Sequence, residues 1–498
     1  MASLSTLLPN PNLISKHNST LSSTHPCAYS WKNKTPTSKG RFSVSCSSSS
    51  QAYDVVVVGA GVIGLTIARH FLVSSDLSVA VVDKAVPCSG ATGAGTSVDG
   101  KQNPWECYVG SCVKESSTLE DAGTEHRRAR FGSYGGVGLE TVCMHVYGNG
   151  TILPMKCMLG TCLRSACVFL GLKGSLLIGR TDAESDVLKG RVKLLCEAGL
   201  KAEYLCSSDL IKEEPDLLVD KDSAAAFLPD DCQIDAYRTV AYIEKTNRSF
   251  ASKGRYTEFY DDPVKCFIRS DSNGEVKAVQ TSKNTIYSKK AVIVAAGCWT
   301  GSLMQDLFRN WGMDLHVPVM PRKGHLLVVQ NFNFLQMNHG LMEADYLNHP
   351  TISGSESPDH QKNLSVSMVA SIDAAGNLLL GSSREFVGFN TNLDESVVSY
   401  IWKRVGEFFP KLKTLPLSDL SASRKVRIGL RPYMLLSVPN GKPVIGPVPG
   451  LSNVYLAAGH EGSGLLMALG TAEMIVEMVL GYPAKVDSTP FAVQKVLV

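Results

Sequence analysis

Residues 53–64 read YDVVVVGAGVIG, and this stretch decides the fold. Its unbroken apolar run predicts a buried parallel strand. The run leads into Gly-x-Gly-x-x-Gly, and the amphipathic pattern that follows predicts a helix. A second apolar run, residues 77–82, ends at Asp83. A strand, a glycine-rich turn, a helix and a second strand that ends in an acid together predict a dinucleotide site.

Each part of this unit has a physical role. Gly59 permits a tight turn, Gly61 lets the backbone approach a pyrophosphate, and Gly64 lets the helix and strand pack closely. The helix N-terminus offers N–H groups and the positive end of a dipole to phosphates. Asp83 can accept hydrogen bonds from ribose hydroxyls. The alternative reading is a βαβ unit with an incidental glycine-rich turn.

The first 50 residues have a composition that differs from the rest of the chain. They contain no Asp or Glu, five Lys or Arg, 14 Ser and 5 Thr. Such a segment cannot bury a core, and an acid-free, Ser-rich, basic leader is typical of an organelle transit peptide. The excess of Ser and Thr over Arg favours the chloroplast stroma over the mitochondrion. A disordered tail without a targeting role is the alternative.

The charge balance argues against a nucleic-acid partner. The leader carries five of the 49 Lys and Arg residues and none of the 46 Asp and Glu residues, so the remainder is slightly acidic. Unbroken apolar stretches stay shorter than the roughly 18–20 residues that span a bilayer, and we expect no transmembrane segment. The roughly 450 residues after the leader suffice for two domains.

Residues 97–170 show neither a helical nor a strand period. This segment holds six cysteines: Cys107, Cys112, Cys143, Cys157, Cys162 and Cys167. Cys-x4-Cys spacings are compatible with metal binding, but no paired His stands at ligand spacing, so we expect no metal site. The alternatives are a disordered insert or a sequence that encodes no packed fold.

Two later strands resemble the first one. A short strand at 285–288, which we expect Lys289 and Lys290 to break, precedes the apolar run 291–297. Small residues at the end of that run suit a ligand that crosses the sheet there. The apolar strand 454–458 meets a glycine-rich turn and then a helix that ends at Leu480. Distant segments therefore contribute to one dinucleotide-binding domain.

The chain resembles the superfamily of FAD enzymes that includes D-amino-acid oxidase, glycine oxidase and sarcosine oxidase, in a plant plastid-type form. The motifs that carry this resemblance occur in family order over most of the mature chain: Val57–Gly64, Gly90–Gly95, Val292–Trp299, Pro321–His325, Gly376–Gly388, Gly429–Pro432, Gly441–Gly446 and Ala457–His460. The resemblance is specific for the superfamily and does not specify a substrate.

The resemblance implies the residues that contact FAD. The ADP half would contact Gly59, Ala60, Gly61, Val62, Ile63, Gly64, Asp83 and Lys84, and the adenine would contact Val264. The pyrophosphate and flavin would lie beside Thr92, Gly93, Ala94 and Gly95. The ribityl chain and isoalloxazine would be enclosed by Ala296, Gly297, Gly459, Gly462, Ser463 and Gly464. No Cys lies near Pro432 or Tyr433, where some relatives attach the flavin, so non-covalent FAD is expected.

Arg431, in Gly-Leu-Arg-Pro, matches the carboxylate-binding arginine of the family. A guanidinium is a planar fork that suits a carboxylate, although an ion pair within the protein would also explain it. His460 is a tentative catalytic residue and His325 a second candidate for binding substrate or flavin. For both histidines, the alternative is a structural role.

The resemblance implies an α/β fold with a split, three-segment Rossmann-like FAD-binding domain and a largely antiparallel α+β substrate domain. We expect the former to comprise residues 51–100, 222–312 and 421–482, and the latter residues 171–221 and 313–420. Residues 1–50 would be the transit peptide and 101–170 a poorly ordered insert.

The implied activity is oxidation of the C–N bond of a small amino acid or N-methyl amino acid, by hydride transfer to flavin N5, with oxygen or a quinone as the acceptor. Oxidation of a 2-hydroxy acid is an alternative within the superfamily. A catalytically defective isoform is another, because segment 97–170 and the extra residues 435–438 depart from the family pattern. A plain NAD-dependent dehydrogenase would not need the elements around Gly93 and Gly459.

Overall fold

The computed structural model describes residues 51–95, 174–197, 199–229, 231, 236–270, 274–309, 311, 315–344, 364–373, 375–435 and 442–493. All of them belong to one unit of the chain, Ser48–Val498, which is distinct from Met1–Ser47. The expected transit peptide and the cysteine-rich segment 97–170 lie outside the described residues. Of the extra residues 435–438, only Leu435 is described.

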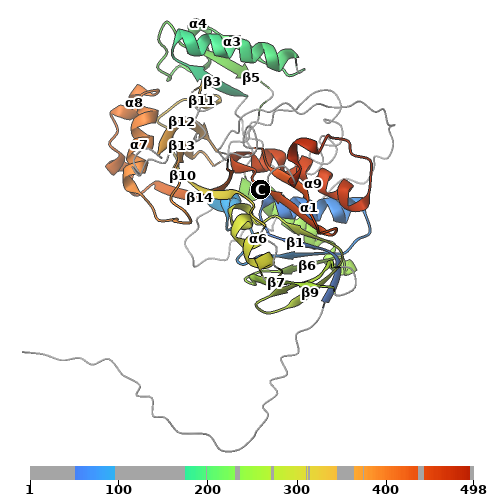
Figure 1. The fold of residues 1–498 in the computed structure, drawn as a ribbon. Coiled ribbons are helices and arrows are strands. Elements are labelled where there is room, and N and C mark those ends of the chain that lie inside the picture. Colours follow the sequence, from blue (N-terminus) through green and yellow to red (C-terminus); the bar gives the residue numbers. More distant parts are fainter. Residues whose placement is uncertain are drawn as a thin grey trace, which may run out of the picture. The chain divides into compact units, whose positions relative to one another are not determined.

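The first sheet contains the glycine-rich turn. Its strands are β1 (Gln51–Val58), β2 (Val79–Val82), β6 (Tyr256–Phe259), β7 (Val264–Arg269), β8 (Val276–Thr281), β9 (Thr285–Val294), β15 (Val444–Pro447) and β16 (Val454–Ala458). The order is β15-β16-β9-β1-β2-β6, and β7 and β8 form an antiparallel extension of β9. The four central strands run parallel, as the unbroken apolar runs predict (Figure 1).

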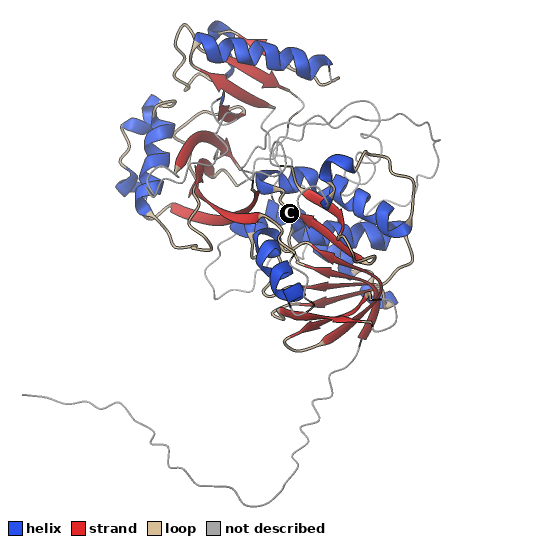
Figure 2. Ribbon diagram, viewed as in Figure 1, coloured by secondary structure: helices blue, strands red, loops and turns tan. Residues whose placement is uncertain are grey.

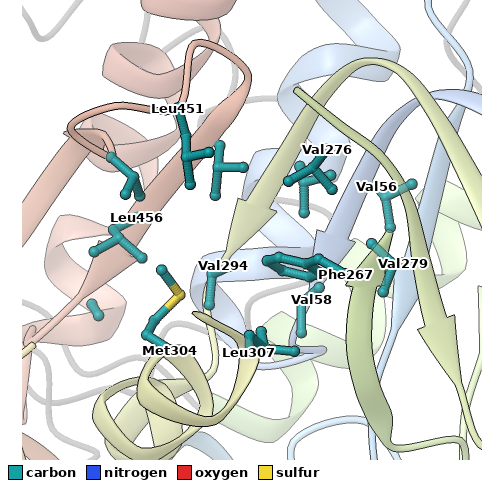
Figure 3. Close-up of a cluster of buried hydrophobic side chains, with 14 of the residues drawn as sticks. Val56, Val58, Phe267, Val276, Val279, Val294, Met304, Leu307, Leu451 and Leu456 are labelled. Atoms are coloured by element: carbon teal, nitrogen blue, oxygen red, sulfur yellow. The ribbon is translucent and has the colours of Figure 1, made fainter. Parts of the chain in front are cut away.

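Helices cover both faces of this sheet, which explains why β1 has no polar alternation. Helices α1 (Val62–Ser74), α5 (Ala236–Arg248) and α9 (Gly464–Leu480) pack on the face to which Val55 and Val57 point. Helix α6 (Thr300–Arg309) packs on the other face. There Val56 and Val58 meet Met304 and Leu307 of α6 in one apolar cluster (Figure 3).

The second sheet has the order β14-β10-β13-β12-β11-β3-β5-β4. Its strands are β3 (Ser175–Gly179), β4 (Glu203–Leu205), β5 (Ala224–Leu228), β10 (Val319–Val329), β11 (Gly340–Glu343), β12 (Ser365–Ile372), β13 (Leu378–Arg384) and β14 (Arg424–Met434). All neighbours are antiparallel except β11 and β3. Its helices are α3 (Asp182–Glu197), α4 (Ser207–Glu213), α7 (Glu395–Gly406) and α8 (Pro410–Lys413), of which α3 and α7 pack on opposite faces of the sheet (Figure 2). A parallel and a largely antiparallel sheet confirm the predicted fold class.

The expected break at Lys289 and Lys290 is wrong, because β9 is continuous through both residues. Tyr53 pairs with Ser288 and Val55 pairs with Ala291, so the two lysines stand opposite the single residue between them. This is a β-bulge, which adds a residue to a strand without ending it. Both lysine side chains are exposed, so the bulge does not bury either charge.

Two strands lie in a different sheet from the one that the expected domain boundaries imply. Strand β5 falls within 222–312 and β14 within 421–482, yet both belong to the second sheet. Strand β14 pairs along its whole length with β10, from Met434 opposite Val319 to Arg424 opposite Val329. A strand's own residues show its period but not the sheet that it joins, so the sequence pattern placed the boundaries too early.

One helical segment of the described part, Glu461–Leu480, is long and apolar enough to cross a membrane by length and composition alone, a test that the core helix of a soluble protein also passes. It comprises α9 and the short 3₁₀ turn η7 (Glu461–Ser463). Helix α9 packs against α1 and buries Ala468, Ala472 and Ile475 in the core of the first sheet.

Candidate cofactor and substrate site

A cleft lies at the carboxyl ends of the parallel strands of the first sheet. Its empty volume is about 1270 Å³, a figure that includes open solvent at its mouth. Walls come from the turns that follow β1, β2, β9 and β16, and from β14. Open α/β sheets bind ligands at this edge.

Many of the predicted cofactor residues, and the tentative catalytic residue His460, line this cleft. They are Gly59, Gly61, Val62, Ile63, Asp83, Lys84, Thr92, Val264, Ala296, Gly297, His460 and Gly464. Ala60, Gly64, Gly93, Ala94, Gly95, Gly459, Gly462, Ser463 and Arg431 are not among its described lining residues. Residues from five distant parts of the chain therefore meet at one edge of the sheet, as the motif order predicts.

The packing of the protein itself requires two of the three motif glycines. Gly59 has φ +116°, and a Cβ there would lie 2.3 Å from the Ala295 carbonyl oxygen. A Cβ on Gly64 would lie 1.9 Å from the carbonyl oxygen of Gly59. Both contacts are far below van der Waals distance with backbone atoms, so a side chain at either position would displace the turn.

Gly61 is different, because the protein leaves room for a side chain there. Its φ is −77°, and the nearest atom to an added Cβ is the Thr92 hydroxyl oxygen at 3.5 Å. This is an ordinary contact that alanine would satisfy. A glycine that packing does not require, at the N-terminus of α1 and facing the cleft, fits a backbone kept bare for a phosphate.

Thr92 lies at the same helix N-terminus, on the 3₁₀ turn η1 (Ala91–Gly95). Its Oγ1 accepts a hydrogen bond of 3.2 Å from the backbone N–H of Val62. This N–H is one of the helix donors that have no intrahelical partner. The loop after β2 and the start of α1 are thereby joined beside Gly61, as expected for a pyrophosphate site.

Asp83 is placed by the turn that it supports. Its Oδ2 accepts from the Ala60 N–H at 2.7 Å, and its Oδ1 accepts from the Ala85 N–H at 2.9 Å. Burial raises the pKa of this carboxyl above its ordinary value, against the two hydrogen bonds that lower it. A carboxylate has about four acceptor sites, so Asp83 retains capacity for ribose hydroxyls.

Trp299 also lines the cleft, although sequence reasoning assigned it no role. The Lys84 Nζ lies 3.5 Å from the centre of the Trp299 ring, and the indole stacks on Phe389 at 5.8 Å between ring centres. Cys298, next to it, also lines the cleft, and burial raises the pKa of its thiol to about 12. In the sequence, the available indication of a role for both residues was their position directly after the small residues that follow β9.

His460 lines the cleft as a neutral imidazole. Its side chain is buried, and Nε2 lies 2.9 Å from the Thr471 hydroxyl oxygen on α9. Burial lowers its pKa to about 3, so it carries no charge at neutral pH. His325 is also buried, with its Nδ1 3.0 Å from Ser383 Oγ, and lies outside the described cleft lining.

Arg431 lies on β14, where Arg322 of β10 is its direct cross-strand neighbour. The Arg431 guanidinium covers Gly324, whose added Cβ would lie 2.2 Å from Nη1, and that Nη1 donates to the Ser383 carbonyl oxygen at 3.1 Å. The neighbouring residues Leu430 and Pro432 point into the cleft instead. The predicted carboxylate-binding arginine thus lies beside the cleft wall.

Glu461 connects the cleft with these arginines, and sequence reasoning assigned it no role. It lines the cleft, its Oε1 accepts from Arg322 Nη2, and its Oε2 accepts from the Gly462 N–H at 2.6 Å. Burial alone would raise the pKa of this carboxyl. The positive charges of Arg322, Arg431 and Arg384 outweigh burial and lower the pKa below its ordinary value. A carboxylate within a glycine-rich turn was the available signal.

Comparison with protein families gives the cofactor. A model of the DAO family, described as FAD dependent oxidoreductase, matches residues 54–124 and 161–478. The chain belongs to this family. It is therefore an FAD-dependent oxidoreductase, as predicted, and FAD is its cofactor. Gly61, Thr92 and Asp83 are the described residues whose geometry best fits the ADP half of FAD.

Curated relatives of this family are amino-acid oxidases and dehydrogenases. The chain is 23% identical over 450 residues to glycine oxidase of Geobacillus kaustophilus, covering 89% of this chain and 97% of the relative. It is 24% identical over 326 residues to D-amino acid dehydrogenase of Allorhizobium ampelinum, covering 65% and 67%. Glycine oxidase of Pseudomonas aeruginosa is 26% identical over 218 residues, which span 49% of its length.

Solved structures of the family share the fold. Glycine oxidase from Geobacillus kaustophilus superposes with a TM-score of 0.63 at 18% identity, covering 89% of this chain and 99% of that one. L-proline dehydrogenase from P. horikoshii gives 0.61 at 17% identity, covering 87% and 95%. L-alpha-glycerophosphate oxidase from Mycoplasma pneumoniae, solved with FAD bound, gives 0.58 at 15% identity, covering 86% and 95%.

Proposed function

We propose that this FAD-dependent oxidoreductase oxidises the C–N bond of a small amino acid or N-methyl amino acid. The family includes glycine oxidases and D-amino acid dehydrogenases as curated relatives. The observation that carries the proposal is the group of arginines beside the cofactor cleft. Arg322 and Arg431 are cross-strand neighbours on β10 and β14. Together with Arg384 they lower the pKa of Glu461, which lines the cleft.

Fixed positive charge beside the cleft suits a substrate that carries a carboxylate. Guanidinium groups remain charged at all physiological pH values and offer several donors in a fixed plane. The cleft is lined largely by apolar residues such as Leu430 and Pro432, so a carboxylate there meets these charges with little competition from water. Arg431 is the residue that we assign to the substrate carboxylate.

FAD, when bound, supplies the acceptor for a hydride from the carbon that bears the nitrogen. The chain's own residues bind and orient the substrate and exclude water. The neutral His460 helps to orient the substrate. Its uncharged, hydrogen-bonded imidazole forms part of the cleft wall without attracting a second anion. We expect either oxygen or a quinone to reoxidise the cofactor.

Anaerobic spectroscopy of the purified, FAD-loaded protein tests this function. A yellow protein whose flavin absorbance bleaches with one small amino or N-methyl amino acid would support the proposal. Bleaching only with 2-hydroxy acids would replace it with hydroxy-acid oxidation. A protein that takes up FAD but is reduced by neither class would instead be the defective isoform, and the proposed function would be wrong.

We further propose that the protein acts in the chloroplast stroma after removal of residues 1–50. Support comes from the acid-free, Ser-rich, basic composition of that segment. A reducing stroma is also compatible with free thiols at Cys88 and Cys298, which line the cleft.

A further inference from the structure

Glu461 is a charged side chain whose position the cofactor alone does not explain. It stands at the start of η7, between the arginines of the second sheet and the cleft at the edge of the first. Its two partners are Arg322, which lies 139 positions earlier in the chain, and the N–H of the following glycine. These contacts fix the carboxylate at the cleft wall.

The carboxylate retains capacity to bind a ligand. Two hydrogen bonds occupy two of about four acceptor sites on its oxygens. Because three arginine charges keep its pKa below the ordinary value, it is ionised at neutral pH. An ionised carboxylate with spare acceptor sites, facing a cleft, attracts a cation with N–H donors.

The backbone of Glu461 adds an independent observation. Its φ is +47°, in the left-handed region, where residues other than Gly, Asn and Asp are uncommon. Such a conformation persists where the surroundings hold it, often at ligand sites. Glycines stand at positions 459, 462 and 464 of the same turn, so this turn holds a glutamate in a conformation that glycine would adopt more easily.

We propose that Glu461 binds the substrate's amino group as a cation and stabilises the positive charge that develops on its nitrogen during oxidation. This inference rests on the proposed function and specifies it. Arg431 would hold the carboxylate end of the substrate and Glu461 the amine end, so that the cleft recognises an amino acid by both of its charged groups.

The chemistry explains why such a residue selects amines. The bound ammonium first gives one proton to solvent, which frees the lone pair of its nitrogen. The Cα–H bond then breaks, and its hydrogen leaves as a hydride, with two electrons, to the oxidised cofactor. The nitrogen lone pair forms a C=N bond, and the nitrogen becomes a cationic iminium, which water later hydrolyses. A 2-hydroxy acid instead loses its hydroxyl proton and yields a neutral ketone. An ionised carboxylate beside the reacting group therefore favours the amine in the transition state.

A matched pair of unreactive ligands tests this role without turnover. 2-Aminoisobutyrate has no α-hydrogen, and pivalate is its isostere with a methyl group in place of the ammonium. For the FAD-loaded wild-type protein we expect 2-aminoisobutyrate to bind more tightly than pivalate, measured by perturbation of the flavin spectrum. In Glu461→Gln, which keeps the shape and removes the charge, the Kd of 2-aminoisobutyrate should rise at least tenfold, and that of pivalate should stay or fall.

Control variants separate recognition from folding. Glu385→Gln removes an acid that pairs with Lys323 on the same sheet, outside the described cleft lining, and should leave the ligand preference unchanged. Glu461→Asp keeps the charge and should retain the preference for the amine. If Glu461→Gln fails to fold, the double variant Arg322→Gln/Glu461→Gln removes both members of the ion pair, and it should also lose the preference.

The inference is overturned if Glu461→Gln weakens both ligands equally or changes neither. Turnover separates that result from failure of the proposed function. A wild-type protein that oxidises amino acids while Glu461→Gln keeps the amine preference would refute the role of Glu461 alone. A wild-type protein that oxidises no amino acid would refute the proposed function, whatever the ligand pair shows.

Discussion

Arg322 and Arg431 lie directly opposite each other on the antiparallel strands β10 and β14. Like charges in this arrangement destabilise a sheet, and Glu461, which pairs with Arg322, offsets part of that repulsion. The Arg322 guanidinium also lies 4.7 Å from the centre of the Tyr433 ring. The two arginines are therefore unequal: one is committed to an internal carboxylate, and the other is assigned to the substrate.

Arg322→Met should destabilise the FAD-loaded protein more than Arg431→Met does. Removal of Arg322 leaves the largely buried Glu461 without its partner, which costs about 3 kcal/mol. Removal of Arg431 relieves a like-charge contact, so we expect it to affect substrate affinity more than unfolding. Urea unfolding of both variants measures the difference, and equal losses in the two would contradict this assignment.

Gly61→Ala should fold normally but bind FAD at least tenfold more weakly. The added methyl meets only the Thr92 hydroxyl at 3.5 Å, yet it stands where a phosphate would approach. Gly64→Ala is the contrasting variant, because its methyl would lie 1.9 Å from a backbone oxygen and the fold itself should suffer. FAD titration by fluorescence quenching and the Tm of the apoprotein separate the two effects. Unchanged FAD affinity in Gly61→Ala would argue against a phosphate at this turn.

Glu244 on α5 should make stability depend on pH. Burial raises its pKa from 4.5 to about 7, despite the opposing charge of Arg248, whose Nη2 lies 2.5 Å from Glu244 Oε1. The folded state thus binds a proton more tightly than the unfolded state. This stabilisation is complete below about pH 4.5 and is lost as the pH rises through about 7, at a cost of up to about 3 kcal/mol.

Glu244→Gln removes that proton equilibrium, so the variant should show a flatter dependence of Tm on pH between 4.5 and 7 than the wild type. Differential scanning fluorimetry across this window provides the measurement. Parallel curves for the two proteins would show that a group other than Glu244 dominates the titration.

Residues 1–50 should direct a fluorescent reporter into isolated chloroplasts and be removed there. Import into mitochondria instead would reassign the compartment. A variant with Lys16, Lys32, Lys34, Lys39 and Arg41 replaced by Glu is the matched control, because it keeps length and Ser content but reverses the charge. We expect that variant to remain outside both organelles.

Local elements could be predicted from the sequence where period and turn residues agree. Strand β16 and the end of α9 lie where the apolar run and the following glycine place them. At β9 the same reasoning failed. Two adjacent lysines suggested that the strand ends there, whereas the structure accommodates them in a β-bulge. A bulge is defined by the partner strand, which a single strand's sequence does not contain.

The cofactor half of the site was accessible from sequence, and the substrate half was only partly so. Gly59, Gly61 and Asp83 act within one continuous unit, so their spacing carries the information. Glu461 depends on Arg322, and their proximity follows from how β10 and η7 meet in three dimensions. Without that pairing, an acid in a glycine-rich turn marks a position of interest but does not specify its role.

The central strands of the first sheet come from distant parts of the chain, and this determines the order in which the cleft can form during synthesis. These strands come from residues 51–58, 285–294 and 454–458, so the last wall of the cleft leaves the ribosome long after the glycine-rich turn. At about 5–20 residues per second, the glycine-rich turn waits tens of seconds for its partners. The nascent chain must therefore keep its most apolar segment from aggregating before any FAD can bind, and flavin loading has to wait for the synthesis of β16.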